Sequence, residues 1–174
     1  MLTTKTPRSN PPMSLGPRHD PEERTDPYAP TGHLEKDSVC GECGAVYDRQ
    51  HWLLDEPRRR ALIATGAARY VVCPACQKMH EESPQGILTL RGDYWPEHRE
   101  LLMQLIRNEE ERARGTNPLE RVMSIRDDER ELCVETTNPK LAQKIGRAIH
   151  HAHQGELKYH WSKGDHLVRV DWVR

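Results

Sequence analysis

The sequence contains no phenylalanine, and tryptophan and tyrosine bring the aromatic share to only 5%. Charged residues make up 30% of the 174 residues. A chain of this length suits one domain of ordinary size or two small ones, but this composition offers limited apolar material for a large core. We therefore expect either small folded parts or a source of stability besides apolar burial.

A long apolar run and a strong net charge are also missing. No stretch of about 18 apolar residues is present to span a membrane, and the N-terminal "MLTTKTPRSNPPMSLGPRHD" has no apolar segment typical of a signal peptide. The formal net charge of −1 excludes a positive field over the whole chain. These absences predict a cytoplasmic protein without a membrane partner, and they restrict any nucleic-acid contact to a local patch.

Recognisable catalytic patterns are absent too, since no Ser-His-Asp set, phosphate loop or open metal site is visible. Cys133 has no evident histidine partner, which favours a structural cysteine over a nucleophile. In "AIHHAHQ" only His150 and His153 share a helix face, which favours a solvated helix end over a metal site. We expect no enzyme and identify no small-molecule substrate.

The composition divides the chain into four parts. Residues 1–38 hold seven of the 13 prolines and few apolar residues, which predicts a disordered tail. Residues 39–94 carry paired cysteines around a short helix that Asp55 caps and Gly66 ends, and residues 95–116 read as a linking helix. Residues 117–174 read as an α+β domain, so the expected fold class is α+β.

The last part shows the order strand, strand, helix, strand, strand, a two-layer ββαββ arrangement with a four-stranded sheet. Its first hairpin turns at residues 127–128, its helix follows Asn138 as a cap, and its second hairpin turns at residues 163–165. Tyr159 and Trp161 alternate in phase with Leu157, which predicts that both aromatic rings lie on the core face. The other face is expected to be a mixed charged surface.

Two CxxC pairs, Cys40 with Cys43 and Cys73 with Cys76, are separated by 29 residues. This is longer than the usual ribbon spacing of about 15 to 20 residues, and the inserted helix explains the excess. Two such turns can place four thiolates around one Zn²⁺ ion in a tetrahedron without an open position, which predicts a structural zinc ribbon. Zinc binding contributes on the order of 10 kcal/mol at neutral pH, enough to stabilise a domain with little core.

The cysteines allow two other interpretations. A thioredoxin-like dithiol in "CPAC" requires the first cysteine to open a helix after a strand, and the second CxxC pair and the β-like flanks argue against it. Disulfides are disfavoured in a reducing cytoplasm. His80 follows the second pair, but four thiolates already saturate zinc, so we expect a surface histidine.

A local basic patch is the best candidate for nucleic-acid contact. On a zinc ribbon it could bind phosphates, while a solvated set of arginines beside Asp55 and Glu56 is an equal alternative. Thr136, Thr137 and Asn138 are best explained by helix capping rather than by an anion site. The patch consists of Arg58, Arg59, Arg60, Arg69, Lys78 and Arg91.

The segments "CGECG", "CPAC", "GILTLRG" and "TTNPKLAQKIGRAIHHAHQGELKYHW" followed by "VRVDW" resemble an uncharacterised bacterial family of small zinc-ribbon proteins. That family is distantly similar to the large-ribosomal-subunit export adaptor of archaea and eukaryotes. The resemblance covers about residues 39–174 and implies that Cys40, Cys43, Cys73 and Cys76 bind zinc. It implies RNA or ribosome association; a protein-interaction or regulatory adaptor shaped by zinc is the alternative expectation.

Overall fold

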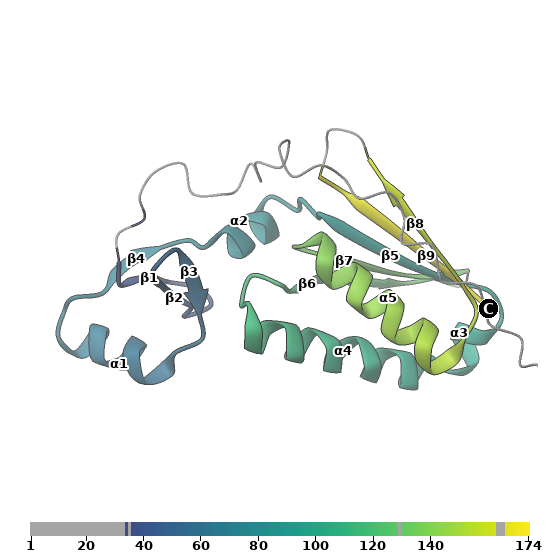
Figure 1. Cartoon of the computed structure of the whole chain (residues 1–174), viewed down its shortest axis with the longest axis horizontal. Helices are drawn as coiled ribbons and strands as arrows, with labels where there is room; N and C mark the ends of the chain where they lie inside the picture. Colours follow the sequence, from purple (N-terminus) through teal and green to yellow (C-terminus); the bar gives the residue numbers. More distant parts are fainter. Residues whose placement is uncertain (1–33, 35, 129, 163–165) are drawn as a thin grey trace, which may run out of the picture.

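The computed structural model describes residue 34 and residues 36–128, 130–162 and 166–174, which fold into two sheets with helices. The first part of the chain contains β1 (Ser38–Cys40), β2 (Val46–Asp48), β3 (His51–Leu53), α1 (Glu56–Ala64), β4 (Arg69–Val71) and α2 (Pro74–His80). The second part contains β5 (Gly86–Arg91), α3 (Tyr94–Glu97), α4 (Arg99–Thr116), β6 (Val122–Asp127), β7 (Glu131–Thr136), α5 (Pro139–His153), β8 (Glu156–Trp161) and β9 (Val168–Val173). Mixed α+β architecture is thus confirmed (Figure 1).

The small sheet has the strand order β3-β2-β1-β4 and carries the cysteine pairs. Strand β1 pairs antiparallel with β2 and parallel with β4, which aligns Cys40 with Val71. Helix α1 follows β3 and precedes β4, so a helix lies between the two cysteine pairs, as predicted. The Asp55 side chain accepts a hydrogen bond from the Arg58 backbone N–H at 3.0 Å, and Gly66 follows the helix with φ of +68°.

Helix α1 buries none of its side chains, so polar contacts hold it in place. Its Arg58 guanidinium forms ion pairs with Asp37 and with Asp48, the latter at 3.0 Å. Arg58 holds the pKa of the Asp48 carboxyl below its usual range, mainly through the hydrogen bond between them. The helix is therefore attached to β2 and to the residue before β1 by charge rather than by apolar packing.

The large sheet has the order β6-β7-β5-β9-β8, and α4 and α5 lie against one of its faces (Figure 1). Strand β5 is central, because it pairs antiparallel with β7 and parallel with β9. Its Leu88 and Leu90 are fully buried in the core that the sheet forms with the helices. The opposite face is crossed by ion pairs, including those from Arg91 to Glu131 and Asp171 at 2.8 and 2.7 Å.

The predicted order ββαββ is confirmed by β6, β7, α5, β8 and β9, but the sheet has five strands and not four, because β5, which the sequence assigned to the ribbon, joins it. The pairing of β5 with β7 and β9 makes it the fifth and central strand of the large sheet. The predicted boundary at residue 94 therefore separates β5 from the sheet to which it belongs. The expected linking helix is also part of this domain, since Leu102 and Ile106 of α4 are fully buried in the same core. The domain therefore begins at β5, not after α4.

Two smaller boundaries differ from expectation. The predicted tail, residues 1–38, lies mostly outside the described residues, but Ser38 belongs to β1 and is 2% exposed. The predicted helix from residue 95 is two helices, α3 and α4, and Pro96 lies within the short α3. The hairpin at residues 127–128 and the Asn138 cap are confirmed, whereas the second turn, at residues 163–165, lies outside the described residues.

The expected burial of the two aromatic rings on β8 was wrong. Their alternation is as predicted, because Tyr159 and Trp161 stand opposite Val170 and Val168 on the helix-bearing face. Yet Tyr159 is 39% and Trp161 42% exposed. Alternation indicates which face a side chain points to, but β8 is an edge strand, and the helices do not cover the outer part of that face.

Candidate metal centre

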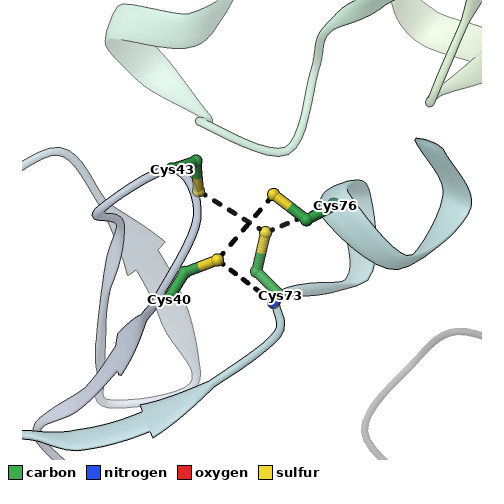
Figure 2. A group of neighbouring side chains, drawn as sticks. All are labelled: Cys40, Cys43, Cys73 and Cys76. Carbon is green, nitrogen blue, oxygen red and sulfur yellow. Dashed lines mark hydrogen bonds between the residues drawn. The ribbon is translucent and has the colours of Figure 1, made fainter. Parts of the chain in front are cut away.

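The four cysteines of the two CxxC pairs lie together (Figure 2), with all their sulfur atoms within 4.8 Å of one another. The Cys40 and Cys76 sulfurs are 3.8 Å apart, and those of Cys43 and Cys73 are 3.7 Å apart. Cys40, Cys73 and Cys76 are at most 2% exposed, and Cys43 is half-buried. The cluster therefore forms a nearly closed, sulfur-lined site.

The first cysteine pair occupies a tight turn after β1. The Gly44 N–H donates to the Cys40 carbonyl at 3.0 Å, and Gly44 has φ of +73°, in the region that glycine tolerates best. A Cβ atom at Gly44 would lie only 2.4 Å from an Arg59 side-chain nitrogen, so helix α1 covers this turn closely. The sequence "CGECG" thus supplies both the ligands and the backbone freedom that the turn needs.

The second cysteine pair opens helix α2. Cys73 is the N-cap residue, and its sulfur accepts from the Cys76 N–H at 3.5 Å. The Cys73 N–H in turn donates to the Cys40 sulfur at 3.4 Å, which ties the two turns together. The parallel pairing of β1 with β4 brings the turns side by side.

A strand followed by a helix at "CPAC" meets the local requirement of a redox dithiol, contrary to our expectation of β-like flanks on both sides. The surroundings decide against this interpretation, because each sulfur of this pair lies within 4 Å of a sulfur from the other pair. Four sulfurs at about 2.3 Å from a tetrahedral Zn²⁺ ion are about 3.8 Å apart. The observed separations therefore fit a metal ion.

Burial and the neighbouring sulfurs raise the pKa of two of the four thiols, Cys73 and Cys76. The Cys73 thiol lowers the pKa of Cys43 to about 5 through a hydrogen bond, while the pKa of Cys73 itself is raised by that partner and by burial. Burial and the nearby Cys43 charge raise the pKa of Cys76 to about 12. A bound divalent cation would supply the positive charge that stabilises all four thiolates.

The large domain completes the shell around the cluster. Arg121, at the start of β6, donates from Nη1 to the Cys76 sulfur at 3.4 Å, and Leu119 packs against the cysteine cluster. Thr137 holds this segment, since its hydroxyl donates to the Leu119 carbonyl at 2.6 Å and accepts from the Arg121 N–H at 2.9 Å. Sequence reasoning missed Arg121 because a single arginine 45 residues from Cys76 carries no local signal.

Lys78 on α2 forms a second connection to the large domain. Its ammonium group is within 2.8 Å of the Gln85 side-chain oxygen and 3.4 Å of the Thr137 carbonyl, and the residue is 4% exposed. Its prediction as a phosphate contact was wrong, because a buried ammonium cannot reach a nucleic-acid backbone. The residue instead joins the helix of the second cysteine pair to the start of the large sheet.

The other residues of the predicted basic patch do not form one positive surface. Arg58 pairs with Asp37 and Asp48, while Arg59 and Arg60 both pair with Glu56. Arg91 lies on the open face of the large sheet with two acidic partners, not on the ribbon. Arg69 is exposed on β4. Acidic neighbours thus offset most of the charge that the sequence pattern suggested.

The remaining candidates lie apart from the metal centre. His80 faces Glu42 at 3.0 Å and is exposed, and Cys133 lies on the open face of the large sheet near Arg126. Asn138 caps α5 by accepting from the Lys140 N–H at 2.8 Å, and the His153 ring contacts the Tyr94 hydroxyl at 2.9 Å. None of these groups joins the four-cysteine cluster.

No protein-family model matches the sequence, and neither a curated protein nor a solved structure matches the chain. The resemblance to zinc-ribbon proteins therefore depends on the motifs alone. Within the described part of the chain, no helix is both long enough and apolar enough to cross a membrane.

Proposed function

We propose that the four cysteines bind one structural zinc ion, and that this ion holds the ribbon together against the large domain. The observation that carries this proposal is the group of four sulfurs within 4.8 Å of one another. A site with four thiolates has no open position for a substrate, so its role is structural and not catalytic. Such thiolates require reducing conditions, which supports a cytoplasmic location.

The metal content of purified protein tests this proposal. We expect about one zinc per chain, and Co²⁺ substitution should give the absorption of a tetrahedral thiolate site. Cys73→Ser should lose the metal, whereas Cys133→Ser should retain it, because Cys133 lies outside the cluster. Iron in place of zinc, or equal metal content in both variants, would contradict the assignment.

For the whole protein we propose RNA binding, in association with the ribosome, as the resemblance implies. Support comes from an uneven distribution of charge: residues 138–174 contain seven lysines and arginines against three acidic residues, while the whole chain has a net charge of −1. A local excess of positive charge favours polyanions even on a neutral protein. The argument for RNA binding thus depends on this segment and not on the ribbon arginines, which are mostly ion-paired.

Sedimentation of tagged protein from cells through a sucrose gradient tests ribosome association. At low salt we expect the protein to migrate with a ribosomal subunit, and high salt should release it because phosphate contacts depend on counterion release. Free migration at low salt, together with no binding to purified rRNA, would exclude this proposal.

The second candidate function is a protein-interaction adaptor with a surface shaped by zinc. It is favoured by apolar side chains that the ribbon leaves exposed, where they could bury against a partner. A stable protein partner that is lost on Tyr70→Ala and resists high salt would favour this function over RNA binding. The exposed residues are Leu53, Leu54, Ile63, Tyr70 and Val72, and Tyr70 is 63% exposed.

A further inference from the structure

Trp161 differs from the other tryptophans of this chain. Trp52, Trp95 and Trp172 are at most 6% exposed, whereas Trp161 is 42% exposed. Tyr159, two residues earlier on β8, is 39% exposed on the same face of the strand. Two neighbouring aromatic rings are therefore accessible on a protein with few aromatic residues.

The two rings lie on an edge strand of the large sheet. Strand β8 forms the edge of the large sheet, and among the described strands it pairs only with β9. The rings share the side of the sheet that carries the helices, because Tyr159 and Trp161 stand opposite Val170 and Val168, which are both buried in the core.

A cation accompanies the aromatic pair. Arg147 of α5 is exposed and lies close enough to the Tyr159 phenol to interact with it. Burial raises the pKa of that phenol, and the Arg147 guanidinium partly offsets the effect. The helix approaches β8 closely at the preceding residue, because a Cβ at Gly146 would lie 3.3 Å from a Leu157 methyl group. Arg147 is thereby positioned beside Tyr159, the first of the two rings.

The charges around the edge favour an anionic ligand. The segment that forms α5, β8 and β9 contains seven lysines and arginines against three acidic residues, and of these cations Lys144 pairs with Glu120 and Lys158 with Glu156. Two of these acidic groups already have cationic partners, since Glu156 pairs with Lys158 at 2.8 Å and Asp171 pairs with Arg91 at 2.7 Å. A polyanion would therefore meet little repulsion here.

We propose that Tyr159, Trp161 and Arg147 bind single-stranded RNA, with bases stacked on the two rings and the guanidinium at a phosphate. Exposed aromatic rings combined with positive charge are the combination that binds single strands, because every base has a flat face. This inference rests on the RNA-binding function proposed above and assigns it to the β8 edge, not to the ribbon arginines.

Tryptophan fluorescence of the zinc-loaded full chain provides a direct test. Because the other three tryptophans are buried, stacking of a base on Trp161 should quench the exposed part of the emission when oligouridylate or oligoadenylate is added. Trp161→Phe should keep the affinity and lose the quenching, since the ring is retained. Binding is measured in parallel by anisotropy of a labelled oligonucleotide.

Alanine variants measure the contribution of each ring. Tyr159→Ala and Trp161→Ala should each weaken binding about tenfold or more, in line with the loss of one stacked base. Tyr70→Ala is the matched control, because Tyr70 is an exposed aromatic residue on the ribbon, and it should bind as the original protein does. Arg147→Glu should weaken binding and reduce its salt dependence, whereas Arg107→Glu, on the exposed surface of α4, should change it less.

The outcomes separate the site from the function. If RNA binds with equal affinity to all the aromatic variants, the β8 site is wrong while RNA binding stands. If the original protein binds no RNA, both proposals fail, and the edge strand is then better explained as a place where a protein strand adds to the sheet. Circular dichroism of each variant confirms that a loss of binding does not reflect unfolding.

Discussion

Hydrogen bonds to sulfur define the metal centre at the scale of single residues. Backbone N–H groups donate hydrogen bonds to the sulfurs of Cys40 and Cys73, whereas the Arg121 side chain donates to the sulfur of Cys76. The Nε atom of Arg121 is buried and has no hydrogen-bond partner among the residues that the structure describes. The Nη1 hydrogen bond to Cys76 at 3.4 Å is what places the guanidinium beside the sulfur, where its charge stabilises a thiolate.

Arg121→Ala should lower the affinity for zinc about ten- to a hundredfold, because residues that hydrogen-bond to metal ligands typically contribute this much. Competition with a colorimetric chelator measures the effect. Arg126→Ala is the matched control, since that guanidinium lies 3.9 Å from the sulfur of Cys133, outside the cluster. Equal zinc affinity in both variants would show that Arg121 does not support the site.

Close packing of β5 against α5 decides the architecture at the scale of elements. A Cβ at Gly86, the first residue of β5, would lie 2.4 Å from the Thr136 hydroxyl and 2.7 Å from the Ala142 Cβ. The strand therefore begins where only glycine fits between β7 and the start of α5. This contact fixes the start of β5 in the large sheet, so the strand belongs to that domain and not to the ribbon.

Gly86→Ala should destabilise the large domain by about 1–3 kcal/mol, the usual cost of overpacking. Gly115→Ala offers the control, because nothing lies within 4 Å of a Cβ at Gly115 in α4, and alanine there should stabilise the helix by up to about 1 kcal/mol. Chemical denaturation of the two variants compares them, and a similar free energy of unfolding for both would contradict the tight packing at Gly86.

At the scale of the whole molecule, the residues that the structure describes form two separate cores. One surrounds the cysteines and includes Trp52, and the other lies between the large sheet and its helices. The two cores are connected by polar side chains, including Arg121 and Lys78, and by the side chain of Leu119. Because the large core contains no cysteine ligand, its stability should not depend on the metal.

Removal of zinc should therefore unfold the ribbon and leave the large sheet intact. In hydrogen exchange, we expect amides of residues 38–80 to lose protection in metal-free protein, while those of β5, β7 and β9 keep it. The sequence assigned β5 to the ribbon, residues 39–94, but β5 should keep its protection because it pairs within the large sheet. Loss of protection throughout β5 would instead indicate that the two parts unfold as one unit.

Local features were predictable from sequence because neighbouring residues determine them. The CxxC spacing identified all four cysteines as ligand candidates, and the cap residues Asp55 and Asn138 marked where two helices begin. Side-chain alternation also gave the correct face for Tyr159 and Trp161. Each of these inferences needs only the geometry of a turn, a helix end or a strand.

Only the tertiary structure decided how these elements combine. It placed β5 at the centre of the large sheet, brought acidic partners to the ribbon arginines and left the aromatic pair on β8 exposed. It also placed Arg121 at the Cys76 sulfur. Strand order, ion pairing and coverage depend on residues far apart in the chain, so no local pattern determines them.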